Sequence, residues 1–511
     1  MPVAKAWCVA LIGVEGHLVE VEAHLADGIP TVSLVGLPDT ALREARDRVR
    51  AAIVNSGLVW PQRRITVGLS PATLPKSGSG FDLALAAAIL AADGKLPHTE
   101  LAAMVVLGEL GLDGRVREIR GVLPAVLAAV RAGFERVVVP LGNTAEAGLV
   151  PGAEVWGVRS LGHLARRLQG EPEQDEDVDV PRIARPPVSD PADGVDLIDV
   201  IGQSDGRRAI EVAAAGGHHL FLLGPPGAGK TMLAERLPSI LPPLDDESSL
   251  EVTAIHSIAG RLASHQPLVT EAPFRNPHHT ASMPALVGGG SGIARPGEVS
   301  LAHHGVLFLD EAPEFARPAL DCLRQPLESG EIRIARAAGV AVYPASFMLV
   351  LAANPCPCAV TSGGGRECSC SAVARRRYLG RLSGPLLDRV DLRVELPTVS
   401  RAELFAERHN VEASEEVACR VRAARARAAL RLAGTPWPTN GRVPGPQLRR
   451  RWPVPRRSMK PVDDALGKGQ LTARGMDRVL RVAWTLADLD GEPVPTSANV
   501  AEAVNYRRLA A

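Results

Sequence analysis

The chain has 511 residues, too many for one ordinary domain, so we expect roughly two to four separate cores. Its 57 basic and 57 acidic residues cancel, which excludes a protein-wide field for nucleic acid or membrane and leaves such binding to local patches. No apolar run reaches the roughly eighteen residues of a membrane span, so we expect a cytoplasmic protein with no membrane contact. Seven cysteines, four of them clustered, fit reduced thiols or a metal site better than a disulfide framework.

Residues 1–169 alternate strand-like and helical segments, which predicts an α/β domain. The run Ala6–Ile12 resembles a short signal core, but it leads into glutamates without a small-residue cleavage site. The acidic, proline-rich stretch 170–197 has almost nothing to bury and is predicted to be a linker. The predicted strands are Thr31–Leu34, Arg64–Leu69, Met104–Leu107 and Arg136–Val139, and the predicted helices are Thr40–Asn55, Phe81–Ala92 and Leu123–Ala132.

A phosphate-binding loop follows the apolar run Leu220–Leu223. The pattern is G-x-x-x-x-G-K-T, and it predicts that the chain binds a nucleoside triphosphate with Mg²⁺. Backbone N–H groups of the turn would cradle phosphates, Lys230 would neutralise them, and the Thr231 hydroxyl would ligate Mg²⁺. The residues of this pattern are Gly224, Pro225, Pro226, Gly227, Ala228, Gly229, Lys230 and Thr231.

Two further apolar runs end in polar residues, as buried parallel strands do at the ligand edge of a sheet. Val306–Leu309 leads into Asp310, which would hold the Mg²⁺ shell, and Glu311, which would polarise the attacking water. Phe347–Ala353 leads into Asn354, placed to orient the same water. Arg389 precedes a further strand and could reach the γ-phosphate of a neighbouring subunit, or form a surface pair with Asp388.

Cys356, Cys358, Cys368 and Cys370 supply four thiolates, the number that a closed zinc site needs. The alternative is a cluster of reduced thiols without metal. The pairs His278–His279 and His303–His304 are interpreted as structural histidines rather than ligands.

Several long strings resemble the bacterial YifB/ComM family of AAA+ ATPases, which is related to the ATPase subunit of magnesium chelatase. The resemblance implies an α/β fold with an AAA+ core at 198–396, a parallel sheet and an α-helical lid at 397–511. It also implies ATP as cofactor, a homo-hexameric ring and, in the competence branch, a DNA helicase that drives branch migration during recombination. DNA, single-stranded or branched, is the expected partner. Asn354 would be the γ-phosphate sensor, Arg389 the finger acting in trans, and Arg474 the lid sensor, with Arg478 and Arg481 as alternatives. The strings are Asp199–Gln203, Gly224–Thr231, Phe274–Thr280, Gly297–Gly305, Asn354–Cys358 and Arg381–Arg389.

The segment Glu331–Tyr343 alternates like a hairpin with arginines on one face. In the related AAA+ clade such a hairpin faces the ring pore, so Arg333 and Arg336 are candidate DNA contacts. Each of these arginines could instead belong to a solvated face, as could the arginine runs 375–377 and 449–457.

The N-terminal domain resembles the proteolytic domain of Lon, through Leu74–Asp82 and Gly114–Leu123. Both catalytic positions are empty: the serine falls on Gly80 and its lysine partner on Leu123, which cannot accept a proton. Lys76 with Ser77 or Ser79 would be a shifted dyad. The favoured reading is a retained fold reused for assembly or for an unidentified protein partner.

Two functions remain open from the sequence. The first is an ATP-driven DNA motor for branch migration. The second is a chelatase-like ATPase that remodels a protein partner during metal insertion.

Overall fold

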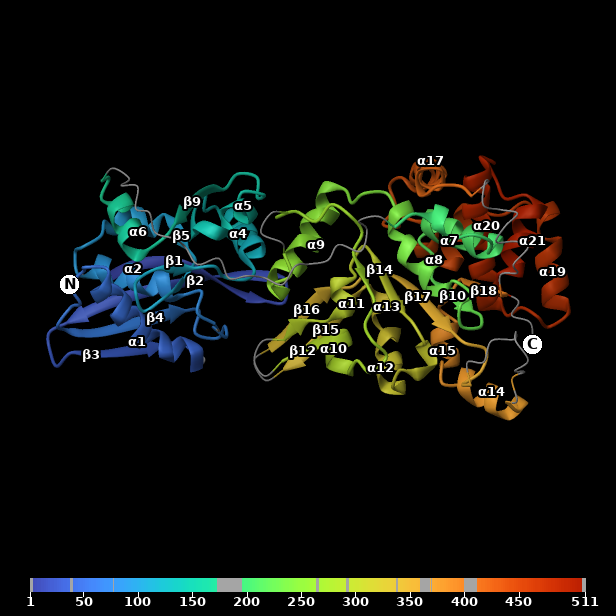
Figure 1. The fold of residues 1–511 in the computed structure, drawn as a ribbon. Helices are drawn as coiled ribbons and strands as arrows, with labels where there is room; N and C mark the ends of the chain where they lie inside the picture. Colours follow the sequence, from blue (N-terminus) through green and yellow to red (C-terminus); the bar gives the residue numbers. More distant parts are fainter. Residues whose placement is uncertain are drawn as a thin grey trace.

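The structure is a computed structural model that describes residues 3–36, 40–76, 78–171, 195–262, 266–290, 294–336, 339–358, 368, 370–398 and 411–507. An α/β region, a second α/β region and a helical region lie in a row (Figure 1). The predicted linker falls largely on 172–194, outside the described residues. None of the helices described is both long and apolar enough to cross a membrane.

The N-terminal region is built on a seven-stranded sheet with the order β3-β4-β2-β1-β5-β8-β9. Helix α2 is buried along its whole length, because its residues Asp82–Ala92 are mostly alanine, leucine and isoleucine. All seven predicted elements of this region are present within one or two residues at each end. The strands are β1 Val3–Ile12, β2 Glu15–Ala26, β3 Thr31–Val35, β4 Arg64–Ser70, β5 Met104–Val106, β6 Glu109–Leu110, β7 Val116–Arg117, β8 Arg136–Pro140 and β9 Glu154–Val158. The helices are α1 Thr40–Asn55, α2 Asp82–Ala92, α3 His98–Ala102, α4 Val122–Arg131, α5 Thr144–Ala147 and α6 Leu161–Leu168.

The longest strands, β1 and β2, pair antiparallel from Val3 opposite His24 to Ile12 opposite Glu15. In β2 every second side chain from Val19 to Leu25 is buried, and the side chains between them are partly exposed. The run Ala6–Ile12 therefore belongs to a strand in the centre of this sheet.

Among the described residues, the N-terminal region contacts the central region at helix α9 and at strand β16. At the first, the buried carboxylate of Glu146 accepts hydrogen bonds from the Leu123 backbone N–H (2.9 Å) and from the Ser257 hydroxyl of α9. At the second, the turn between β1 and β2 meets strand β16. A Cβ on Gly13 would lie 2.4 Å from the carbonyl oxygen of Val342, so the two backbones touch at that point.

The central region contains a five-stranded sheet with the order β11-β14-β17-β10-β18, and all four pairings in it are parallel. The carboxyl ends of these strands therefore meet at one edge. The strands are β10 Leu220–Leu223, β11 Phe274–Arg275, β12 Gly288–Gly289, β13 Arg295–Pro296, β14 Val306–Leu309, β15 Glu331–Arg336, β16 Gly339–Pro344, β17 Met348–Ala353 and β18 Leu392–Glu395. The helices are α7 Ser204–Gly216, α8 Lys230–Arg236, α9 Asp246–Ala259, α10 Met283–Val287, α11 Glu298–Leu301, α12 Arg317–Asp321, α13 Pro326–Ser329, α14 Ala372–Leu379 and α15 Gly384–Leu387.

The predicted hairpin is present as β15 and β16, paired antiparallel from Glu331 opposite Pro344 to Arg336 opposite Gly339. The expectation that its arginines share one face is wrong. Side chains alternate along a strand, so Arg333 and Arg336, three residues apart, point to opposite faces. Both side chains are exposed, because the buried positions of β15 are Ile332 and Ile334.

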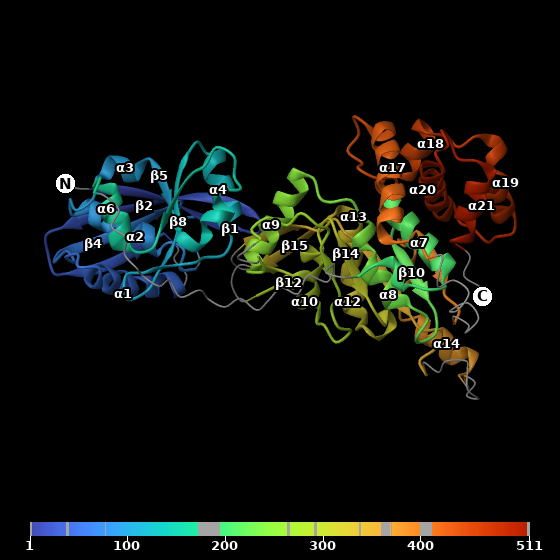
Figure 2. The same cartoon turned by 45° about the horizontal axis from the view of Figure 1, so that its top comes forward.

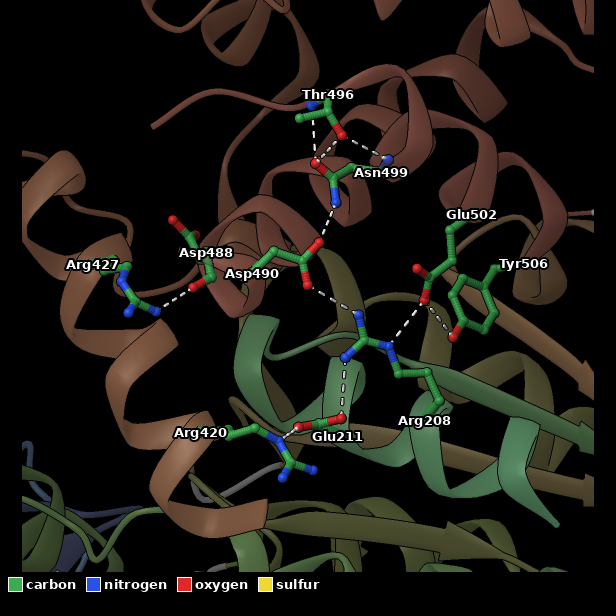
Figure 3. A network of polar contacts seen from close by, with 10 residues as sticks. All are labelled: Arg208, Glu211, Arg420, Arg427, Asp488, Asp490, Thr496, Asn499, Glu502 and Tyr506. Atoms are coloured by element: carbon green, nitrogen blue, oxygen red, sulfur yellow. Dashed lines mark hydrogen bonds and ion pairs between the residues drawn. The ribbon is translucent and has the colours of Figure 1, made fainter. Parts of the chain in front are cut away.

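The C-terminal region is helical, as expected, and packs beside α7 (Figure 2). Polar contacts join α7 to the C-terminal helices (Figure 3). Arg208 of α7 contacts Glu502 at 3.1 Å and Asp490 at 3.6 Å, and Glu211 of the same helix accepts from Arg420 at 2.5 Å. The helices are α17 Ser414–Leu432, α18 Gly445–Arg451, α19 Lys460–Gly467, α20 Ala473–Asp490 and α21 Ser497–Asn505.

Candidate active site

The phosphate loop joins β10 to α8 at the carboxyl edge of the five-stranded sheet. Gly227 and Gly229 have φ of 77° and 82°, a backbone region that residues with a side chain rarely adopt. The Lys230 ammonium donates to the carbonyls of Gly224 (2.6 Å) and Pro225 (2.9 Å), so its charge is held inside the turn. Burial lowers the pKa of Lys230 from its usual value.

Two oxygen ligands suited to Mg²⁺ lie together beside this loop. The Thr231 hydroxyl, at the start of α8, donates to the Asp310 carboxylate at 2.8 Å. Asp310 follows β14, which is separated from β10 only by β17. Hydroxyl and carboxylate oxygens are the donors that Mg²⁺ takes in phosphate-binding sites, so these residues fit the ion.

Asn354 and Glu311 lie at the same carboxyl edge of the sheet. Asn354, at the end of β17, accepts a hydrogen bond from the Lys230 ammonium at 3.0 Å. Glu311 has its carboxylate half-exposed and lies beside His279, with 3.3 Å between Oε2 and Nδ1. The sequence predicts a structural role for His279 and does not indicate this contact. His279 follows β11, the strand next to β14, and this position was the available signal. Because β11 is only two residues long, the sequence does not predict it as a strand.

Arg389 lies away from these groups in the isolated chain. Its guanidinium donates to the Pro385 carbonyl at 2.6 Å and contacts the Glu328 carboxylate. Among the described residues, its partners include none of Lys230, Asp310 and Glu311.

The three candidate lid arginines lie on α20 and differ in their surroundings. Arg474 is 87% exposed and lies 3.8 Å from Asp388. Arg478 contacts Asp391 at 2.6 Å. Arg481 is mostly buried, and its Nε has no hydrogen-bond partner among the described residues.

Asp391 joins the central sheet to the helical region. Its side chain is 2% exposed and lies near Arg478, His218 (3.3 Å) and the backbone N–H of His219 (3.4 Å). Burial opposes ionisation, but Arg478 and His218 outweigh it and hold the pKa of Asp391 well below its usual value. The segment that carries Arg389 is thus joined to α20 through Asp391.

The four clustered cysteines converge. The sulfur of Cys356 lies 3.1 Å from that of Cys358 and 3.3 Å from that of Cys368, and all four sulfur atoms lie within 4.8 Å of one another. A tetrahedral zinc with Zn–S bonds of about 2.3 Å separates its sulfurs by about 3.8 Å, so the cluster fits the ion. Residues 359–367 and 369, between the two pairs of cysteines and within the second pair, lie outside the described residues.

His303 and His304 both contact the Glu251 carboxylate, at 3.1 and 3.0 Å. Nδ1 of His303 accepts from the Ser346 backbone N–H at 2.9 Å, so in the neutral ring Nε2 carries the proton and donates to Glu251. That leaves His303 no free nitrogen lone pair for a metal, in agreement with a structural role.

A groove runs along β15, from Ile332 to Arg336, and reaches Arg389. Arg333 and Arg336 line it together with Arg324 and Glu328. Arg333 also contacts Glu331 at 2.7 Å, which offsets part of its charge locally.

Comparison with known proteins gives full-length relatives. An uncharacterised protein of Mycobacterium tuberculosis is 54% identical over 511 residues, with all of both chains covered. YifB of Escherichia coli, itself uncharacterised, is 41% identical over 500 residues, covering 98% of this chain and 96% of YifB. Competence protein ComM of Haemophilus influenzae is 41% identical over 510 residues, covering 100% of this chain and 98% of ComM.

The chain belongs to the YifB/ComM family. Three family profiles of the magnesium chelatase subunit ChlI match it as well: "Subunit ChlI of Mg-chelatase" at 21–143, "Magnesium chelatase, subunit ChlI" at 196–404 and its C-terminal region at 411–507. The YifB/ComM family is therefore one of chelatase-like AAA+ proteins, for which ATP and Mg²⁺ are the expected ligands.

This YifB/ComM-family chain also resembles Lon protease of Rhizobium meliloti, at 29% identity over 145 residues, which cover 27% of this chain and 18% of Lon. Lys76 is buried, which lowers its pKa, and it donates to the carbonyls of Leu69 (3.2 Å) and Pro71. Ser79 instead contacts the Glu109 carboxylate. No serine–lysine pair is present among the described residues; Ser77 lies outside them.

Proposed function

We propose that this chain is an ATP-driven ring motor that acts on DNA and promotes branch migration during recombination. The observation that carries the proposal is the convergence of Lys230, Thr231, Asp310 and Asn354 through direct hydrogen bonds at one sheet edge. Family membership supports ATP hydrolysis, and Glu311, directly after Asp310, is the carboxylate proposed to polarise the attacking water.

Two observations support the proposal that the motor acts on DNA. One full-length relative is named a competence protein. The β15–β16 hairpin presents Arg333 and Arg336 to solvent, where exposed guanidinium groups can follow a phosphate backbone.

The position of Arg389 supports the proposal of a ring of identical subunits, with six as the family number. Arg389 is the arginine proposed to stabilise the transferring phosphate, yet in the single chain it contacts Glu328 and Pro385 instead of the phosphate loop. A neighbouring subunit whose nucleotide faces Arg389 would supply the missing partner.

ATP hydrolysis in the presence and absence of single-stranded, forked and four-way DNA tests this proposal. Lys230→Ala should abolish nucleotide binding, and Glu311→Gln should bind ATP without hydrolysing it. Arg333→Ala/Arg336→Ala should lower DNA affinity and the slope of its salt dependence while basal hydrolysis stays intact. Arg46→Ala/Arg63→Ala is the matched control, because it removes two exposed arginines from the N-terminal region.

The second candidate is a chelatase-like ATPase that remodels a protein partner for metal insertion. The match of all three chelatase profiles favours it. If no DNA stimulates hydrolysis or is unwound, this candidate replaces the DNA motor.

Zinc is proposed as a structural ion at the four cysteines. The ion would tie Cys356, two residues beyond Asn354 in the segment after β17, to Cys370, two residues before α14. The geometry that supports it is the four sulfurs within 4.8 Å. About one zinc per chain by elemental analysis is the expected result.

The Lon-like region is proposed to serve assembly or partner binding rather than proteolysis. Gly80 and Leu123 stand where Lon carries its catalytic pair, and Lys76 is committed to backbone carbonyls. A casein or peptide hydrolysis assay in the presence of ATP should show no activity.

A further inference from the structure

The stretch 417–462 of the helical C-terminal region carries charge of one sign. It contains eleven arginines and one lysine but no aspartate or glutamate, whereas the whole chain has a formal net charge of zero. A surface that serves only solubility carries interspersed charges of both signs. A stretch of one sign instead attracts anions, unless other parts of the fold supply the missing carboxylates.

The fold supplies partners for part of this charge. The arginines of α17 pair with carboxylates or donate to backbone carbonyls. Arg442 donates to the Ser346 hydroxyl at 2.6 Å, and Arg449 pairs with Asp477. The other five cations are exposed, and none of them forms an ion pair with a carboxylate among the described residues. These five define the C-terminal cationic face: Arg450, Arg451, Arg456, Arg457 and Lys460.

The C-terminal cationic face is supported by one small hydrophobic core. Leu448 of α18, Trp452 and Met459 pack on the same cluster of apolar side chains. These residues alternate along the chain with the exposed cations, so the scaffold holds the cations in place. Arg450 and Arg457 are seven residues apart, which limits the distance between their Cα atoms to about 25 Å. That length is shorter than one turn of duplex DNA, about 34 Å.

The surroundings of the face favour a phosphate backbone over a protein partner. Protein interfaces have an apolar centre, but no large apolar side chain of residues 436–462 is exposed. The tryptophans beside the face are also occupied. The Arg451 guanidinium lies over Trp437 at 5.6 Å, and the rings of Trp437 and Trp452 meet at 81°. Single strands bind where ring faces are free to stack on bases, so a duplex, which needs only charge, fits this face better.

We propose that the C-terminal cationic face binds the phosphate backbone of a double-stranded arm of the DNA substrate. The proposal rests on the DNA motor proposed above and adds a second contact to it. Helix α18 carries part of the face and lies in the C-terminal region, away from the β15–β16 hairpin of the central region (Figure 2). The hairpin and the face would therefore hold different parts of one branched molecule.

The test measures the affinity of the full-length protein for a blunt duplex of about 30 base pairs, by fluorescence anisotropy over a range of salt concentrations. Arg450→Gln/Arg456→Gln/Arg457→Gln should weaken duplex binding at least about tenfold at about 0.1 M salt. The slope of log K against log salt concentration should fall by about 2–3, because each neutralised phosphate contributes about 0.9. Arg450→Lys/Arg456→Lys/Arg457→Lys keeps the charge and should bind within about threefold of wild type.

Two comparisons show whether the effect belongs to this face and to duplex DNA. Arg46→Gln/Arg50→Gln/Arg63→Gln removes three exposed arginines from the N-terminal region and should leave duplex affinity within about twofold of wild type. A single strand of the same length as the duplex is the second comparison. Its affinity should change by less than about threefold in the C-terminal glutamine variant, because the hairpin is its proposed contact.

Wild-type duplex affinity in the C-terminal glutamine variant would overturn the proposal. An equal loss in the N-terminal variant, or an equal loss for the single strand, would overturn it too. A glutamine variant that keeps duplex affinity but loses salt-dependent self-association in analytical ultracentrifugation would assign the face to a second copy of the chain. Wild-type protein that binds neither DNA would refute the DNA motor and the face with it, whereas unchanged binding by the variant would refute the face alone.

Discussion

Arg478→Ala isolates a buried carboxylate and is expected to loosen the helical C-terminal region. Asp391 is 2% exposed, and Arg478 is its closest charged partner at 2.6 Å. Breaking a buried ion pair by removing one member costs about 3–5 kcal/mol, because the other charge stays desolvated. His218 and the His219 N–H remain near Asp391, so we expect the lower end of that range.

Hydrogen exchange of peptides that span 473–490 is the suitable measurement, because it reports the opening of α20 without requiring the whole chain to unfold in one step. A loss of about 3 kcal/mol corresponds to a fall in protection of roughly a hundredfold. Arg474→Ala is the control on the same helix. Its side chain is 87% exposed, and we expect a change below about 0.5 kcal/mol.

The double variant Arg478→Ala/Asp391→Asn tests the cause. If the cost comes from an unpaired charge, removing that charge should restore a large part of the lost protection. A single variant that loses less than about 1 kcal/mol, or a double variant as unstable as the single, would refute the view that burial isolates Asp391.

Burial lowers the pKa of His219 to about 3, so as pH falls from about 6.5 the unfolded chain binds a proton that the folded chain does not. Stability should therefore drop with decreasing pH by up to about 1.4 kcal/mol per unit in urea titrations, and a flat profile between pH 6.5 and 4 would contradict this. Arg389→Ala subunits should bind ATP but, mixed into wild-type rings, lower turnover out of proportion to their fraction; a linear loss would indicate a role within one subunit. Cys368→Ser/Cys370→Ser should lose zinc by elemental analysis together with the order of α14, whereas metal-free wild type with full activity would leave the cysteines as thiols.

The sequence was informative where short patterns fix local geometry. The apolar runs before the phosphate loop and before Asp310 predicted two strands of a parallel sheet, and a parallel sheet brings its carboxyl ends together. The sequence could not show that His279 meets Glu311, because β11 is too short to register as a strand. The β1–β2 hairpin was missed for a different reason. The run Ala6–Ile12 of β1 is apolar on both faces and resembled a short signal core. The spacing of Arg333 and Arg336 was enough to predict that they lie on opposite faces, because side chains an odd number of residues apart on a strand point to opposite faces.

The contact between the β1–β2 turn and β16 has a mechanical consequence. Gly13 meets Val342 backbone to backbone, on the strand that pairs directly with the one carrying Arg333 and Arg336. A polymer pulled past those arginines would load the hairpin, and the load would pass through this contact into the seven-stranded sheet. A side chain at Gly13 would push the two apart, whatever its polarity. In the proposed DNA motor, the N-terminal region would act as a fixed support for the hairpin, and a partner that binds this region would gain a direct route to the hairpin.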